Sequence, residues 1–324
     1  MDSKKVLKTL LYKNAQSDFD NYNLQDLLQK ALTECPKPKH RMENIDSGGT
    51  IKRVINAFTM FGGMLFGQML MFQPGKDQTI LIVDDDSDSY PVEQMSPPET
   101  KDGKKQEFLQ SAFYFGILEN HVVVVQSQSL RTREFENHLL WLLLESTSVL
   151  SKDKIITLSD QPTKKAREAI EKSDVKKVLV GSGLETKVDP TTKKRSNKKE
   201  LQFKPVGRGF DILRAALGAD WMDKLKLTDS LEDSNLQVNL EITYSRKTTE
   251  YAHKMLNNIA TSLRHCEPDD VKVHIAGGGI LKGDDLKMSG KKYILAYNGV
   301  VDSTDLYKIM HEWLKQKIGD DEIV

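Results

Sequence analysis

The chain has 324 residues, enough for two domains with a sizeable core, and it balances 47 Lys and Arg against 47 Asp and Glu. The chain therefore lacks the overall excess of basic residues that many nucleic-acid-binding proteins have. Cys35 and Cys266 lie in unrelated contexts and offer no disulfide framework, and residues 1–5 lack an apolar core, so we expect no signal peptide and a cytoplasmic location.

The distribution of charge is more informative than the total. Residues 1–160 hold 18 Lys and Arg against 22 Asp and Glu, residues 161–208 hold 14 against 6, and residues 209–324 hold 15 against 19. One segment therefore carries the positive excess. We predict a mixed α/β protein of the α+β class, with antiparallel or mixed sheets packed against helices. Its parts are an N-terminal domain (1–160), a basic segment (161–200) and a C-terminal domain (201–324).

Residues 4–33 predict helix, and Asn23 is placed to cap the second part of it. Residues 54–72 contain no charge and a small-xxx-small spacing, which raises the alternative of a membrane helix. Asn56, Gln68 and three glycines favour instead a pair of buried strands that break at the Gly62-Gly63 step.

The middle of the chain predicts a strand at 79–83, closed by an acidic run, and then a long loop over 87–105. Residues 108–118 and 121–126 predict a hairpin that turns at Glu119-Asn120. A helix capped by Ser127 or Ser129 follows and runs to about residue 145. Its expected inward-facing side chains are Phe135, Leu139, Leu142 and Leu143.

The second half predicts a basic helix (163–172) and a strand (175–180) that the Gly181-Ser182-Gly183 step ends. A polar basic loop (187–199) and a short amphipathic helix (209–218) come next. The remaining predicted elements are a strand at 236–244, a long helix at 247–265, strands at 271–276 and 291–297, and a helix at 303–317. In the long helix we expect Tyr251, Met255, Leu256, Ile259 and Leu263 to face inward.

Enzymatic motifs are weak throughout. A carboxylate cluster follows the strand at 79–83 and is of the kind that binds Mg²⁺, so a metal-dependent nuclease is an alternative function. An acidic loop at the end of a strand explains the same residues, which are Asp84, Asp85, Asp86 and Asp88. The zinc-type ligands Cys35, His40, His265 and Cys266 lack suitable spacing. A dinucleotide loop after residue 180 fails because Thr186 replaces the third glycine, and Gly277-Gly278-Gly279 predicts a tight turn. We expect no catalytic residues, metal or cofactor.

The basic segment is the remaining candidate site, because phosphate backbones attract clustered cations regardless of sequence. A solvated charged surface, or a scaffold that contacts an acidic protein, is the alternative. No aromatic residues interleave with the charges, which favours duplex backbone binding over stacking on single strands. The candidate DNA-binding residues are Lys164, Lys165, Arg167, Lys172, Lys176, Lys177, Lys193, Lys194, Arg195, Lys198, Lys199, Arg208, Arg246 and Lys247.

Two runs of residues, Phe210-Asp211-Ile212-Leu213 and Ala216-Leu217-Gly218-Ala219, resemble the RexA phage-exclusion family. The similarity continues in order over residues 110–320, through Ser230-Leu231, Arg246-Lys247 and Pro268-Asp269 and in the hairpin around 113–124. The resemblance implies a homodimer that binds double-stranded DNA without strong sequence preference, senses infection by another phage and works with a membrane channel partner. The chain departs from the family in its longer N-terminal region, its acidic 77–105 loop and its 187–199 insert.

Overall fold

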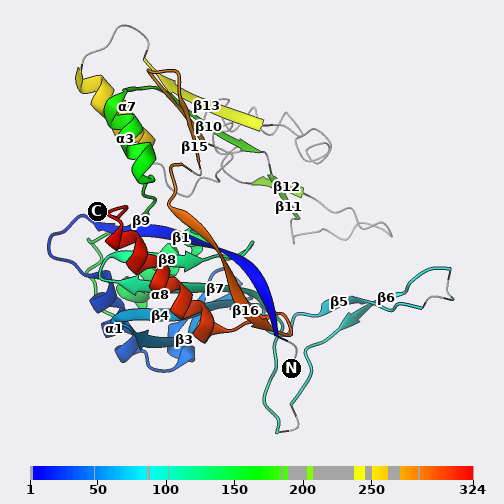
Figure 1. Ribbon diagram of the computed structural model, residues 1–324. Helices are drawn as coiled ribbons and strands as arrows, with labels where there is room; N and C mark the ends of the chain where they lie inside the picture. Colours follow the sequence, from blue (N-terminus) through cyan, green and yellow to red (C-terminus); the bar gives the residue numbers. More distant parts are fainter. Residues whose placement is uncertain are drawn as a thin grey trace. The chain divides into compact units, whose positions relative to one another are not determined.

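The computed structural model in Figure 1 describes residues 3–46, 48–84, 86, 88–100, 102–183, 185–188, 203–206, 237–244, 250–261, 271–283 and 285–323. The fold is mixed α+β, as predicted, with antiparallel sheets and packed helices. The chain divides into two compact units: unit 1 comprises Met1–Gln161 and Met288–Val324, and unit 2 comprises Pro162–Lys287. The predicted C-terminal domain (201–324) is therefore not one piece, because residues 288–324 belong to unit 1.

Unit 1 is built on a sheet of nine strands among the described residues, ordered β17-β16-β1-β8-β7-β4-β3-β2, with β9 also paired to β1. Every pairing in this sheet is antiparallel. The strands are β1 (Ser3–Ser17), β2 (Met42–Asn44), β3 (Lys52–Phe61), β4 (Met64–Phe72), β7 (Leu109–Leu118), β8 (His121–Val125), β9 (Ile156–Ser159), β16 (Ser289–Tyr297) and β17 (Val300–Val301).

Helices cover both faces of this sheet (Figure 1). On one face, α1 (Leu24–Glu34), α2 (Thr132–Trp141) and the π-helical turn η2 (Leu142–Ser146) bury a core with Phe113 and Phe115 of β7. On the other face, α8 (Ser303–Gly319) packs Met310 and Trp313 against β1, β4 and β8. A short 3-10 turn, η1 (Pro38–Arg41), precedes β2. The central strands of the sheet are thus buried on two sides.

The prediction of a helix from residue 4 onward is wrong for its first half, where β1 forms a strand. Leu7, Leu10 and Leu11 fall at the i, i+3, i+4 spacing of a helix, which explains the error. Leu10 is buried on the α8 side of the sheet, whereas Leu11 packs against the core under α1 and α2. A strand buried on both faces places apolar residues next to one another and so loses its period of two.

Several other predictions for unit 1 are confirmed. Asn23 caps α1 by accepting a hydrogen bond from the Asp26 amide at 3.1 Å. The uncharged stretch forms the strand pair β3 and β4, which turns at Gly62 and Gly63 with positive φ at both. The hairpin of β7 and β8 is also present. No helix among the described residues is long and apolar enough to cross a membrane.

Two boundaries in unit 1 differ from expectation. The helix expected after residue 127 begins at Thr132 with Arg131 at the N-cap position, and Ser127 accepts a hydrogen bond from the Leu130 amide instead. The four predicted inward side chains are buried. The strand expected at 79–83 is β5 (Gln78–Leu81), and it pairs with β6 (Val92–Met95), which lies inside the expected loop. Both strands are exposed throughout.

Unit 2 contains a four-stranded antiparallel sheet in the order β13-β10-β14-β15 among its described residues. Its elements are α3 (Lys164–Lys172), β10 (Val175–Gly183), β11 (Glu185–Val188), β12 (Phe203–Val206), β13 (Gln237–Thr243), α7 (Glu250–Thr261), β14 (Val271–Ile275) and β15 (Ile280–Lys282). β11 and β12 pair as a separate ribbon. The Gly181-Ser182-Gly183 step continues β10 and does not end it. The predicted helix at 209–218 lies outside the described residues.

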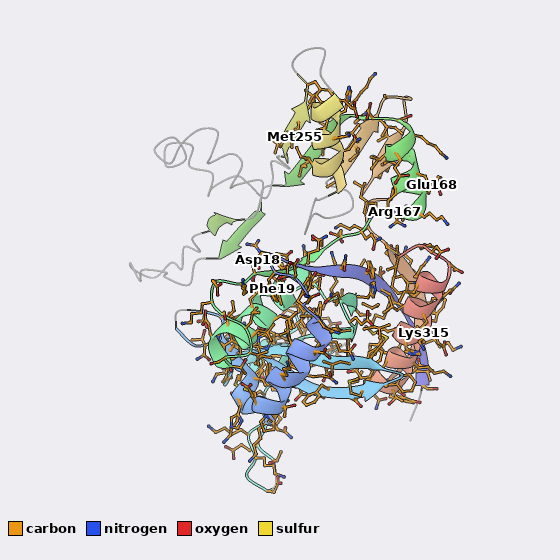
Figure 2. All side chains as sticks on the ribbon, turned by 90° about the vertical axis from the view of Figure 1, so that its left-hand side faces the viewer. Asp18, Phe19, Arg167, Glu168, Met255 and Lys315 are labelled. Atoms are coloured by element: carbon orange, nitrogen blue, oxygen red, sulfur yellow. The ribbon has the colours of Figure 1, made fainter. Side chains whose placement is uncertain are left out.

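The core of unit 2 joins α3 and α7 to one face of this sheet. Ala166 and Ile170 of α3 meet Leu256 and Ala260 of α7 over the valines of β10 and β14. One inward prediction is wrong: Met255, labelled in Figure 2, is 53% exposed, so the inner stripe of α7 lies one residue further along. The triple glycine forms the predicted turn between β14 and β15, with Gly278 at a φ of 85°.

A polar cluster is buried in unit 1. Glu43 of β2 lies opposite Arg53 of β3, whose Nη2 donates to its Oε2 at 2.8 Å. His138 of α2 is fully buried, with Nδ1 2.8 Å from the same oxygen. Burial lowers the pKa of His138 despite the nearby carboxylate. Burial raises the pKa of Glu43, but hydrogen bonds from His138 and Arg53 outweigh it and leave that pKa lowered. The pair is therefore a neutral imidazole, with Nδ1–H donating, and a carboxylate.

We expect unit 1 to lose stability as the pH falls below about 6.5, the ordinary pKa of histidine. Below that pH the unfolded chain binds a proton at residue 138 that the folded protein does not accept, so unfolding becomes more favourable. Below the ordinary pKa of glutamate, protonation of Glu43 in the unfolded chain adds to the loss. Denaturant titrations at several pH values measure the effect.

The matched variants are His138→Gln, which should remove the first part of the pH dependence, and His40→Gln, an exposed histidine whose replacement should leave the profile unchanged. Equal pH profiles for the wild type and His138→Gln would contradict the assignment.

Candidate nucleic-acid interface

The predicted basic helix is present as α3. Thr163 caps it by accepting a hydrogen bond from the Ala166 amide at 3.3 Å. Ala166 and Ile170 are buried against the sheet of unit 2, which orients the helix. The side turned away from the sheet carries three exposed cationic side chains: Lys164, Lys165 and Lys172.

Acidic residues dilute the charge of α3. The helix carries four cationic and two anionic side chains, and Lys172 Nζ lies 3.8 Å from Glu168 Oε2. Figure 2 shows Arg167 and Glu168 as neighbours on this helix, and Arg167 is partly buried. Because exposed ion pairs at this spacing contribute little energy, Lys172 remains able to exchange its partner for a phosphate.

Lys177 faces the opposite side of the sheet. In β10, Val178 and Val180 are buried in the core under α3 and alternate with Lys177 and Leu179. Lys177 Nζ is 3.4 Å from Glu241 Oε2 of β13. Lys176 is exposed where the register between β10 and β14 shifts. The candidates on α3 and Lys177 therefore do not form a single surface.

Two lysines that the sequence analysis did not single out join Lys177 on the open face of the sheet. Lys272 of β14 lies opposite Leu179, and Lys282 of β15 lies opposite Lys272. Both are exposed, and neither forms an ion pair with another described residue. Like charges directly opposite each other are destabilising, which an anionic ligand would relieve. The alternation of Lys272 with the buried Val271 and Val273 is the sequence signal that marks this face.

The other predicted DNA-binding residues lie outside the described residues, so the structure does not place them: Lys193, Lys194, Arg195, Lys198, Lys199, Arg208, Arg246 and Lys247.

Among the described residues, the structure does not assemble either of the alternative metal sites. Asp84 and Asp86 lie beyond β5, Asp85 is outside the described residues, and no group of three metal-ligating side chains occurs in the described part of the chain. Cys35 is buried, with its Sγ 3.8 Å from Ser146 Oγ. His265 and Cys266 are also outside the described ranges.

Comparison with protein-family models finds no match to this chain, and comparison with curated proteins finds no significant one.

Proposed function

We propose that this protein is a RexA-like phage-exclusion protein that binds double-stranded DNA largely without sequence preference. The observation that carries the proposal is the open sheet face of unit 2, where Lys177, Lys272 and Lys282 lie on three neighbouring strands. The ordered resemblance of residues 110–320 to that family supports it. On the same resemblance, the protein is a cytoplasmic homodimer that senses infection by another phage and acts with a membrane channel partner.

The chemistry of this face suits phosphates better than bases. Its cationic groups are lysines, which contact phosphates as flexible point charges. Their described neighbours on the face include Leu179, His274 and Ile280, and none of the described residues there is Phe, Tyr or Trp. Phosphate contacts position a protein on DNA without reading its sequence, so the face accounts for binding that has little sequence preference.

We expect duplex binding to depend steeply on salt. With about four to six phosphate contacts, affinity should fall roughly a hundred- to a thousandfold between about 50 and 200 mM salt. Lys272→Glu combined with Lys282→Glu should weaken all duplex sequences equally and flatten the slope of log K against log salt by about 1.8, since each contact contributes about −0.9. Gel-shift titrations on two unrelated duplexes at several salt concentrations measure both effects.

The control is Lys30→Glu with Lys76→Glu, which makes the same change in net charge at exposed lysines of unit 1. A slope shared by the wild type and the sheet-face variant would contradict this interface. Parallel titrations of Lys164→Glu/Lys165→Glu and of the Lys193, Lys194 and Arg195 reversal then locate the contacts. Plasmid incubated with and without Mg²⁺ tests the nuclease alternative, which predicts a degraded band rather than a shifted one.

A further inference from the structure

The strand pair β1 and β16 in unit 1 is strongly basic, although its halves lie at opposite ends of the chain. Residues 3–11 pair with residues 289–297, and together these segments carry five lysines and no acidic residue. Lys8 and Lys292 are directly opposite each other. None of the five forms an ion pair with another described residue. Side chains alternate along both strands, so Lys4, Lys8 and Lys292 share the face that carries Ile294 and Ala296, whereas Lys5 and Lys291 lie on the opposite face. The five are Lys4, Lys5, Lys8, Lys291 and Lys292.

Two exposed tyrosines lie on the same face of the pair as Lys5 and Lys291. Tyr293 is 65% exposed and Tyr297 is 38% exposed, whereas Ile294 and Ala296, which lie between them in sequence, are buried, and Ile294 packs in the core under α8. The two tyrosines therefore share the face turned away from α8, about 13 Å apart along the strand. Both rings are exposed, so they are not covered by apolar neighbours as the aromatic residues of a core are.

The register places cations within this aromatic row. Lys291 precedes Tyr293 by two residues on the same face, and Lys5 lies opposite Leu295, between the two tyrosines. Leu7, directly opposite Tyr293, and Val300, opposite Tyr297, extend the apolar surface beside the rings. Two carboxylates that follow β17, Asp302 and Asp305, accept hydrogen bonds from backbone amides of α8 and of Leu295. They are not aimed at the lysines.

The pair is also open at its edges. β8 pairs with β1 only from Leu11 onward, so between Ser3 and Leu10 the neighbour of β1 in the described structure is β16 alone. β17 pairs with β16 only at Ala296 and Tyr297. Figure 1 shows β1 and β16 running side by side towards the N-terminus. A flexible strand therefore has access to the tyrosine face from both sides.

We propose that this tyrosine–lysine face binds single-stranded nucleic acid, with bases stacked on Tyr293 and Tyr297 and phosphates contacted by Lys5 and Lys291. Sequence-tolerant single-strand binding combines a cationic track with aromatic rings on which successive bases stack. The proposal is independent of duplex binding by unit 2, because it concerns different strands and a different form of nucleic acid.

The test uses the full-length protein and a labelled oligothymidylate, followed by fluorescence anisotropy. Tyr293→Ala with Tyr297→Ala should weaken binding by at least about 25-fold, since each lost base–aromatic stack costs about five- to a hundredfold in affinity. Tyr293→Phe with Tyr297→Phe should bind as the wild type does. Tyr90→Ala, at a tyrosine of similar exposure in the exposed β5–β6 region, is the matched control and should have no effect. An oligouridylate probe shows whether RNA binds equally well.

Duplex gel shifts separate this inference from the proposed function: the tyrosine variant should keep duplex binding, and the Lys272/Lys282 reversal should keep single-strand binding. Ultraviolet cross-linking of wild-type protein to a bromodeoxyuridine oligonucleotide, read by mass spectrometry, should identify Tyr293 or Tyr297 even if the variants fold poorly. Wild-type-like binding by a folded Tyr293→Ala/Tyr297→Ala protein, no oligothymidylate binding by the wild type, or cross-links confined to other segments would each overturn the inference.

Discussion

Lys13→Met should destabilise the protein by about 3–5 kcal/mol, the usual result of removing one partner of a buried ion pair. Lys13 of β1 donates a hydrogen bond from Nζ to Oδ1 of Asp160, which follows β9, and each side chain is only 3% exposed. Without the ammonium group, the Asp160 carboxylate stays buried with no opposite charge beside it. Denaturant unfolding of the variant, compared with the wild type at neutral pH, measures the loss.

A second variant separates the lost pair from a lost contact. Lys13→Met with Asp160→Leu replaces both charges by apolar groups, which is often neutral or even stabilising, so most of the lost stability should return. Lys152→Met, at an exposed lysine, should change the free energy of unfolding by no more than about 0.5 kcal/mol. If Lys13→Met changes the free energy of unfolding no more than Lys152→Met does, the buried Lys13–Asp160 pair does not stabilise the fold as expected.

Gly67→Ala should cost about 1–3 kcal/mol, because two glycines in the centre of the unit 1 sheet lie beneath aromatic rings. Gly67 of β4 is directly opposite Phe115 of β7, and a Cβ at residue 67 would lie 2.3 Å from the Phe115 ring. Gly116 and Phe66 repeat the arrangement one register position along, at 2.5 Å. Each ring fills the space that the missing side chain leaves, so Gly116→Ala should behave in the same way.

A double-mutant cycle tests this reading. Phe115→Leu should reduce the cost of Gly67→Ala, since the shorter side chain leaves room for a methyl group, and the coupling should be about 0.5 kcal/mol or more. Gly319→Ala is the control, because a Cβ there meets no atom within 4 Å. Thermal or denaturant unfolding gives the four values. Additive costs at residues 67 and 115 would show that the ring does not restrict residue 67.

The sequence predicted elements best where one local signal was sufficient. Asn23 marks the start of α1 through its capping side chain, and Gly62-Gly63 marks the turn between β3 and β4 because both residues have positive φ. β1 was not predicted as a strand, because a strand with buried residues on both faces lacks the alternation that identifies strands. Nothing local to residues 3–17 indicates that their partners are β16 and β8.

The candidate sites, too, were predictable only where the signal is local in the sequence. The basic helix α3 was predictable because its charges are close together in sequence. Lys272 and Lys282 were not predicted as site residues because each is a single lysine in its strand, and the register of β14 and β15 brings them together. The β1–β16 lysines lie in two short basic runs at opposite ends of the chain, and the net acidic totals of residues 1–160 and 209–324 conceal them. The β14–β15 hairpin and the long-range pairings of β10 with β14 and of β1 with β16 create these surfaces, and composition does not encode the registers.

The pairing of Ser3 with Tyr297 also constrains the order in which the protein folds during its synthesis. At about 5–20 residues per second, a nascent β1 waits roughly 15–60 seconds on the ribosome before its neighbour β16 is synthesised. During that interval the sheet of unit 1 has an unpaired edge at β1, whereas every strand of the four-stranded sheet in the inserted segment 162–287 has already been made. A chain that terminates before residue 288 never acquires the strand that covers this edge, and the free edge is a template for aggregation.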